Sequence, residues 1–166
     1  MSVDMFWRRT PPAAAVSLSP AELADLVPDW FDEDFAELTQ AGILVGAEDT
    51  GDLAVHLLVL GAGDGPHRAA AETVSRPPAG FDRQYRVGVY GADLVRAAAG
   101  FLAGAPVATW AEQHADTLAA KAGSLGYRRP MSADWISEIV ATASELVALI
   151  QAAAEAGEVL VYKVDG

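Results

Sequence analysis

The residues whose spacing most suggests chemistry form a glycine-rich segment, Gly61-Ala62-Gly63-Asp64-Gly65, with His67 close behind it. Glycines so spaced let backbone N–H groups and the start of the next helix approach an anionic ligand, such as a nucleotide or S-adenosylmethionine. That arrangement needs a strand before the loop, and the apolar run Leu53 to Leu60 fits either a strand or a buried helix. Pro66 stands where a third glycine is expected, and Val59 where an acidic residue is. Two interpretations stay open, a ligand-binding loop and a plain connection, and we favour the connection.

Histidines are the next candidates for catalysis or metal binding, and the chain has three: His56, His67 and His114. Neither of two common zinc-binding spacings, His-x-x-x-His or His-x-x-Glu-His, occurs among them. His56 lies in an apolar run, so we expect a hydrogen-bonded histidine in the core or at a helix cap. His67 is close to Asp64, and we interpret that pair as a turn contact. Since the chain also has no cysteine and no Ser-His-Asp order, the sequence predicts no catalytic residue, metal site or cofactor.

A dense acidic segment carries five carboxylates, Asp29, Asp32, Glu33, Asp34 and Glu37. Its spacing does not fit the calcium loop of an EF-hand, although weak binding of a divalent cation stays open. Asp29 is expected to cap a following helix, with Asp32 and Glu33 favouring the positive end of that helix. Taken together, the carboxylates indicate either a solvated face that keeps the protein soluble or a docking surface for a basic partner protein.

The charge of the whole chain is strongly negative, and basic residues are few. The net charge is −12, and no Lys or Arg occurs between Thr10 and His67. Nucleic-acid binding is therefore disfavoured, because it needs a basic surface to neutralise phosphates. A basic doublet, Arg128-Arg129 beside Tyr127, precedes the last predicted helix and could hold an anion or a carboxylate. The alternative that we favour is a surface loop that offsets part of the acidic charge.

The last quarter of the chain predicts the elements that position these residues most clearly. From Ser132 to Gly157 apolar side chains recur at helical spacing, at Ile136, Ile139, Val140, Ala143, Leu146, Val147, Ile150 and Ala154. Ser132 is the expected N-cap, and Gly157 the residue that ends the helix. The following segment, Glu158 to Val164, is apolar on both faces, which is typical of a central strand covered on both sides.

Further segments complete an α+β pattern without an internal repeat. We predict an edge strand and a short strand, at Met5 to Arg9 and Gln84 to Tyr90. We predict two helices that begin with capping boxes, at Ser19/Glu22 and at Thr109/Glu112. Three more helices are predicted over Trp30 to Ala41, His67 to Val74 and Ala92 to Ala103. In the first of these three, Phe31 is expected to point inward. The expected fold is therefore one α+β domain over residues 1–166, with a mixed sheet of a few strands, about five to six helices, and a long C-terminal helix followed by a buried terminal strand.

Composition indicates a soluble protein. No apolar run approaches the roughly 18 residues of a membrane span, and Ala13 to Leu18 is too short for the apolar core of a signal peptide. We therefore expect a cytoplasmic protein without a membrane partner. The abundance of alanine is typical of a GC-rich, actinobacterial-type genome rather than of a low-complexity tract.

Four short motifs match one known family. They are Val16 to Leu23 with its Ser-Pro-x-Glu-Leu helix start, His56-Leu57-Leu58 with Gly61, the apolar positions of Val95 to Leu102, and the closing run Ala152 to Leu160. Together they resemble the YfbM-like family of small bacterial proteins. The resemblance implies a single α+β domain with a mixed sheet and several helices. The family has no assigned activity, so the resemblance implies no catalytic residues.

These observations lead to two expectations for function. The first is a domain that acts by binding a basic protein partner through its acidic segment, without doing chemistry. The second is a protein that binds a nucleotide or S-adenosylmethionine at the loop Gly61 to Gly65. The structure of Leu53 to Leu60 bears on both, because a helix there agrees with the family resemblance and a parallel strand favours the nucleotide loop.

Overall fold

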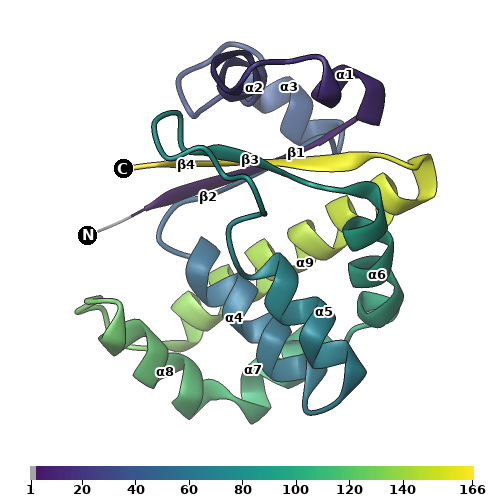
Figure 1. The fold of residues 1–166 in the computed structure, drawn as a ribbon. Coiled ribbons are helices and arrows are strands. Elements are labelled where there is room, and N and C mark those ends of the chain that lie inside the picture. Colours follow the sequence, from purple (N-terminus) through teal and green to yellow (C-terminus); the bar gives the residue numbers. More distant parts are fainter. Residues whose placement is uncertain (1–2) are drawn as a thin grey trace.

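One antiparallel sheet organises the part of the chain that the computed structural model describes, residues 3–166 apart from the side chain of residue 73. Its strands are β1 (Asp4–Thr10), β2 (Leu44–Ala47), β3 (Val87–Tyr90) and β4 (Val159–Asp165), in the order β2-β1-β4-β3 (Figure 1). The sequence predicts a mixed sheet, and this detail is wrong. β1 and β3 run in the same direction, but β4 lies between them, so every neighbouring pair is antiparallel.

The two central strands are β1 and β4, which come from opposite ends of the described chain. β4 is central and buried on both faces, as its apolar pattern predicts. The prediction of β1 as an edge strand is wrong, because β1 pairs with β2 on one side and β4 on the other. Pro11 and Pro12 both follow Thr10, the last paired residue, so their missing N–H groups remove no hydrogen bond from the sheet.

Alternation along the central strands divides the core between the two faces of the sheet. Phe6, Val159 and Val161 point to one face, and Trp7 and Leu160 are among the residues that point to the other. The first face is covered by α1 (Pro12–Val16), α2 (Pro20–Leu26) and α3 (Phe35–Gln40), which lie above the sheet in Figure 1. Both faces of the sheet therefore carry apolar side chains that must be shielded from water, and each face is covered by its own layer of helices.

The larger layer consists of six helices on the opposite face. They are α4 (Gly51–Ala62), α5 (Pro66–Val74), α6 (Ala92–Leu102), α7 (Val107–Gln113), α8 (Ala115–Ser124) and α9 (Ala133–Ala156). The described residues thus form nine helices, more than the five to six predicted. One reason is a break at His114, which divides the predicted helix from Thr109 to Ala122 into α7 and α8. Thr109 does not cap a helix, because α7 already begins at Val107.

The strand predicted from Gln84 to Tyr90 is shorter than expected. Residues 84–86 form a turn, because Asp82 Oδ1 accepts hydrogen bonds from the backbone N–H groups of Gln84 and Tyr85, both at 2.9 Å. Asp82 and Val87 then exchange backbone hydrogen bonds across that turn, and β3 begins at Val87. A side chain that bonds to nearby backbone competes with strand formation in this way.

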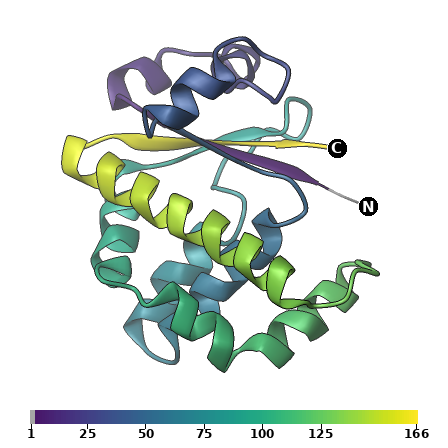
Figure 2. The ribbon, with the colours of Figure 1, turned by 180° about the vertical axis from the view of Figure 1, so that it is seen from behind.

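The long C-terminal helix is confirmed in its position and in both of its ends. α9 begins after Ser132, whose Oγ accepts a hydrogen bond from the N–H of Trp135 at 3.2 Å. It ends at Gly157, which has the left-handed φ of 67°. Figure 2 shows α9 crossing the face of the sheet, where it contacts α4, α6 and α7 as well as β1, β2 and β4. Its apolar stripe is therefore the main contact between the sheet and the larger layer.

By length and composition alone α9 is also apolar enough to cross a membrane, and so are α6 and α7 together, although they meet at an angle of 73°. In the structure the most apolar side of α9 packs on the sheet and its neighbouring helices, with Trp135, Ile139 and Ala153 fully buried. The core helix of a globular domain passes the same test of length and composition.

The cap of α9 provides a test of this packing. We expect Ser132→Ala to lower the free energy of unfolding by about 1 kcal/mol, because the N–H of Trp135 loses its side-chain acceptor. The matched control is Ser137→Ala, an exposed serine of the same helix, which we expect to change it by less than about 0.5 kcal/mol. Urea unfolding followed by circular dichroism measures both, and equal effects would show that the cap does not stabilise α9.

Candidate functional site

Four carboxylates of the acidic segment lie in the connection from α2 to α3, and the fifth, Glu37, lies in the first turn of α3. α3 begins only at Phe35, whereas the sequence predicts a helix from Trp30. The reason is local hydrogen bonding: Asp29 Oδ1 accepts from the N–H of Phe31 at 2.9 Å, and Asp32 Oδ2 accepts from the N–H of Asp29 at 2.8 Å. These bonds close a turn that competes with the helix. Asp29 therefore caps a turn, and Asp34 holds the N-cap position of α3 without a side-chain bond.

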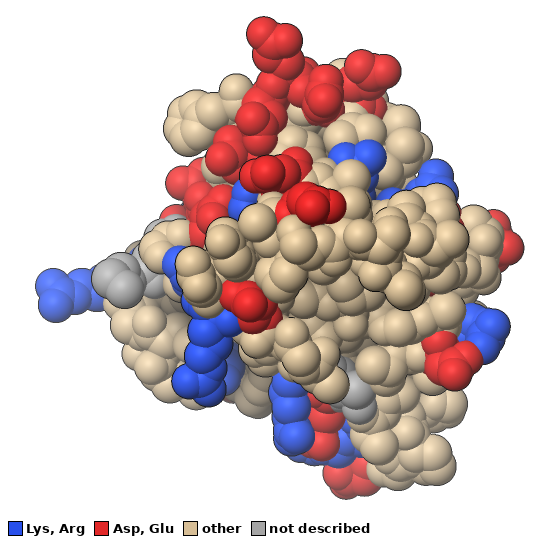
Figure 3. Space-filling model, turned by 45° about the horizontal axis from the view of Figure 1, so that its top comes forward, with Lys and Arg blue, Asp and Glu red and all other residues tan. Residues whose placement is uncertain are grey.

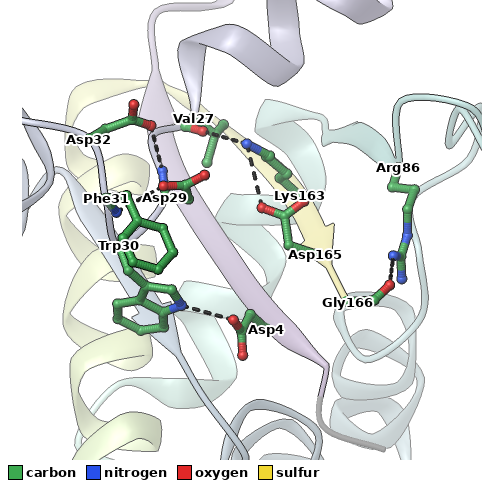
Figure 4. Close-up of polar contacts among 10 residues, drawn as sticks. All are labelled: Asp4, Val27, Asp29, Trp30, Phe31, Asp32, Arg86, Lys163, Asp165 and Gly166. Carbon is green, nitrogen blue, oxygen red and sulfur yellow. Dashed lines mark hydrogen bonds and ion pairs between the residues drawn. The ribbon is translucent and has the colours of Figure 1, made fainter.

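Trp30 anchors this turn to the sheet. Its ring lies 5.1 Å from the ring of Phe6 on β1 and 4.9 Å from the ring of Phe35, measured between centroids. Its Nε1–H donates to Asp4 Oδ2 at 2.9 Å, as Figure 4 shows. Aromatic pairs at these distances contribute beyond the area that they bury. The connection is thus held in one position by contacts at its first aromatic residue.

Phe31, the next residue, is turned to solvent. Its side chain is 93% exposed, so the prediction that it points inward is wrong. The helical spacing that suggested an inward position does not apply, because this part of the chain is a turn. Trp30 and Phe31 are drawn together in Figure 4, with only Trp30 directed along the sheet towards Asp4. The fold therefore holds one large apolar side chain in water beside several carboxylates.

The five carboxylates predicted as a partner surface, which we call the acidic surface, are Asp29, Asp32, Glu33, Asp34 and Glu37. The last four are exposed and Asp29 is half-buried. Figure 3 shows acidic side chains gathered at the top of the molecule, the side on which α1–α3 lie in Figure 1. Among the described residues no group of three or more His, Asp or Glu side chains is arranged to hold a metal ion. The acidic surface is thus an open array of negative charge.

A hollow of about 410 Å³ lies at the edge of the acidic surface, lined by Asp25, Asp32, Glu33 and Asp34 together with Arg8. Arg8 Nη1 donates to the carbonyl oxygen of Leu26 at 2.6 Å. Burial lowers the pKa of Arg8, and the negative charge of Asp34 acts in the opposite direction. Arg8 stays charged, since an arginine pKa lies far above neutral pH. It is therefore a fixed positive charge beside the carboxylates, and it bonds to the backbone.

The glycine-rich loop does not have the arrangement that a nucleotide loop needs. Leu53 to Leu60 is helical, so the loop follows the helix α4 and not a strand. Gly61 still belongs to α4, and a Cβ atom there would lie 2.0 Å from the ring of Trp110. Gly63 and Gly65 have φ values of 64° and 117°, which non-glycine residues rarely adopt. Close packing and chain reversal thus account for all three glycines.

The other two loop candidates, Asp64 and His67, are not brought together. Asp64 pairs with Arg68 at 3.5 Å and is fully exposed. His67 is exposed, and its ring lies 6.2 Å from that of Phe101. The predicted turn contact between Asp64 and His67 is therefore replaced by a contact of each residue with a different partner, and the loop presents no shared site.

In the basic doublet, Arg129 also has a partner within the chain. Arg129 donates to both carboxylate oxygens of Glu138, at 2.9 and 2.8 Å, and its guanidinium lies 5.1 Å from the centre of the Trp135 ring. This hydrogen bonding lowers the pKa of Glu138. Tyr127 packs edge-on against Trp135, with 5.6 Å between centroids, whereas Arg128 is exposed. The segment therefore stabilises the start of α9, and Arg129 already has a carboxylate partner within the chain.

His56 lies in a polar hollow that the sequence does not predict. The hollow measures about 300 Å³ and is lined from α4, α5 and α8, with Arg68, Arg76 and Lys121 among its residues. His56 is half-buried and, within the described chain, its ring has no hydrogen-bond partner, which differs from the bonded histidine expected. Burial, followed by the positive charges of Lys121 and Arg68, lowers the pKa of His56. In the sequence Arg68 lies in the predicted helix and Arg76 follows shortly after it, but Lys121 comes from a distant segment.

Comparison of the chain with family models, curated proteins and solved structures gave no significant match. The resemblance to the YfbM-like family therefore stays a prediction from short motifs, and function is argued below from geometry and charge.

Gly61 allows a direct test of the packing explanation for the loop. We expect Gly61→Ala to lower the free energy of unfolding by about 2 kcal/mol, because the added methyl group overlaps the Trp110 ring. Gly100→Ala in α6 is the matched control: it meets no neighbour within 4 Å and is expected to stabilise the protein by about 0.5 kcal/mol. Thermal and urea unfolding check both, and a stable Gly61→Ala variant would contradict the packing argument.

His56 should make stability depend on pH. Its folded-state pKa is lowered from the ordinary 6.5, so the unfolded chain binds the proton more readily. The stabilisation is complete above about pH 6.5 and is lost as the pH falls through the lower folded value. Urea unfolding over this range should therefore show a shallower loss of stability for His56→Gln than for the unchanged protein. His67→Gln, at an exposed position, is the control, and an equal effect there would refute the assignment.

Proposed function

We propose that this protein is a soluble cytoplasmic domain that acts by binding a basic partner protein at the acidic surface, without doing chemistry. The observation that carries the proposal is Phe31, which the fold holds 93% exposed beside the carboxylates. A large aromatic side chain in water costs free energy, and such residues are enriched among the anchors of protein interfaces. The carboxylates around it supply the charge complementarity that a Lys- or Arg-rich partner requires.

The rigidity of the turn supports the same proposal. Trp30 is packed between Phe6 and Phe35 and hydrogen-bonded to Asp4, so the backbone that carries Phe31 is positioned before any partner arrives. The side-chain bonds from Asp29 and Asp32 fix the turn itself. A preorganised surface loses less conformational entropy on binding than a flexible one. This favours a docking surface over a merely solvated face, which gains nothing from a fixed aromatic residue.

The net charge of the protein bears on how fast a basic partner would associate with it. With a net charge of −12 the protein attracts cations from a distance, and acidic side chains gather on one side of the molecule (Figure 3). Association with a basic partner should be fast at low salt and slow as salt rises, because exposed charges are screened beyond roughly 10 Å at 0.1 M salt.

We expect the triple variant Asp32→Lys, Glu33→Lys, Asp34→Lys to weaken binding to a fluorescent Lys/Arg-rich peptide by at least about tenfold, as measured by anisotropy. The matched control reverses three exposed carboxylates elsewhere, Glu112, Glu145 and Glu155, and so changes the net charge equally. The control should bind nearly as tightly as the unchanged protein. If both triple variants lose affinity equally, net charge alone explains the binding, and the acidic surface is not a site.

Phe31→Ala distinguishes an anchored interface from simple attraction of charges. We expect it to weaken the peptide roughly fivefold to thirtyfold when the peptide carries an aromatic residue, while stability changes by less than about 0.5 kcal/mol. Val16→Ala, at another exposed apolar residue, is the control. Unchanged affinity in Phe31→Ala would remove the observation on which the proposal rests.

A further inference from the structure

The hollow around His56 gathers basic side chains in an otherwise acidic protein. Of the 11 Lys and Arg residues of the chain, Arg68, Arg76 and Lys121 line this one hollow of about 300 Å³. The carboxylates that line it are Asp52 and Glu72, so three positive charges face two negative ones in the lining, and Asp64 outside the lining also pairs with Arg68. The hollow lies among α4, α5 and α8, on the opposite side of the sheet from the acidic surface (Figure 1). It is therefore independent of the function proposed above.

The two arginines are held in place by the protein. Glu72 lies 2.9 Å from Arg68 Nε and 3.9 Å from Arg76 Nη2, so one carboxylate bridges both guanidinium groups. The Tyr90 hydroxyl donates to the carbonyl oxygens of Val74, at 3.1 Å, and of Arg76. Tyr90 is 2% exposed, and these bonds fix the segment that carries Arg76 to the sheet. Contacts within the protein thus keep both arginines at the hollow in the absence of a ligand.

Two further groups have unused capacity for hydrogen bonding or charge. Within the described chain Lys121 has no ion pair, and the ring of His56 has no hydrogen bond. Lys121 and Arg68 are close enough to His56 to lower its pKa by their charge. These residues come from α8, α5 and α4, so three separate elements direct positive or donor groups at one space.

We propose that this hollow binds a small phosphorylated molecule, with its phosphate held by Arg68, Arg76 and Lys121. The planar guanidinium groups match phosphate oxygens in a two-point manner, and Lys121 supplies a point charge. A protonated His56 would add a donor. The hollow has the volume of the smallest ligand pockets, which suits a phosphate ester or a diphosphate and not a dinucleotide.

The first experiment is a titration of the whole protein with inorganic pyrophosphate at constant ionic strength, followed by NMR of the histidine rings. We expect the His56 signals to shift and the pKa of His56 to rise on binding, because the bound anion stabilises the imidazolium form. His67 and His114 lie outside the residues that line the hollow and act as internal references. If all three histidines respond alike, or none does, the proposal is wrong.

The second experiment uses variants and calorimetry. The double variant Arg76→Gln, Lys121→Gln should lower the affinity for pyrophosphate at least about tenfold. Arg83→Gln, Arg128→Gln removes two exposed arginines that do not line the hollow and should leave the affinity unchanged. Equal losses in both variants would overturn the proposal, and so would equal binding of sulfate and pyrophosphate by the unchanged protein. Neither variant touches the acidic surface, so peptide binding there should persist, and the two proposals can fail separately.

Discussion

The antiparallel pairing of β1 with β4 is the constraint on which the rest of the packing depends. All seven residues of each strand take part, so the centre of the sheet is made from segments near opposite ends of the described chain. Both strands place apolar side chains on both faces. Such a pair is stable only when both faces are covered, because an apolar strand face in water forfeits the free energy of burial. The two helical layers are the solution to that requirement.

The two layers also carry surfaces of different charge. The smaller layer carries the acidic surface, and the larger one carries the basic hollow around His56. Aromatic side chains help to tie each layer to the sheet, since Trp30 bonds to Asp4 on β1 and Tyr90 extends from β3 to the segment after α5. Rigid strands position functional groups more accurately than loops do. A domain without a convergent catalytic set among its described residues can thus present two surfaces of different chemistry.

Much of the fold can be predicted from the sequence, because buried faces of helices and strands carry apolar residues at regular spacing. α9 and β4 are predicted nearly to the residue, since one face of the helix and both faces of the strand are apolar. Periodicity does not decide between helix and strand for Leu53 to Leu60, because α4 is buried over most of its circumference. The turn at Phe31 is missed for another reason: side-chain bonds from Asp29 and Asp32 compete with the helix, and Trp30 anchors the turn to a residue distant in the sequence, Asp4.

The candidate sites divide in the same way. The acidic surface is contiguous in sequence, so composition alone identifies its residues, although not the exposure of Phe31. Arg68 and Lys121 lie 53 positions apart in the printed sequence and meet only because α8 packs on α4. No pattern within a single segment of the sequence predicts that two such distant residues line the same hollow. Conversely, the glycines around Gly61 form a conspicuous local pattern, and packing against Trp110 explains the first of them.

The position of β4 has a consequence for how the protein is made. β1 is synthesised well before its main partner, which spans residues 159–165. At a synthesis rate of about 5–20 residues per second, roughly 10–30 s pass between the synthesis of β1 and that of β4. During that interval the nascent chain can pair β1 with β2 but leaves the other edge open, and an unpaired apolar edge invites aggregation. Pairing of β1 with β4 joins segments that are distant in the sequence, and contacts of that kind slow folding.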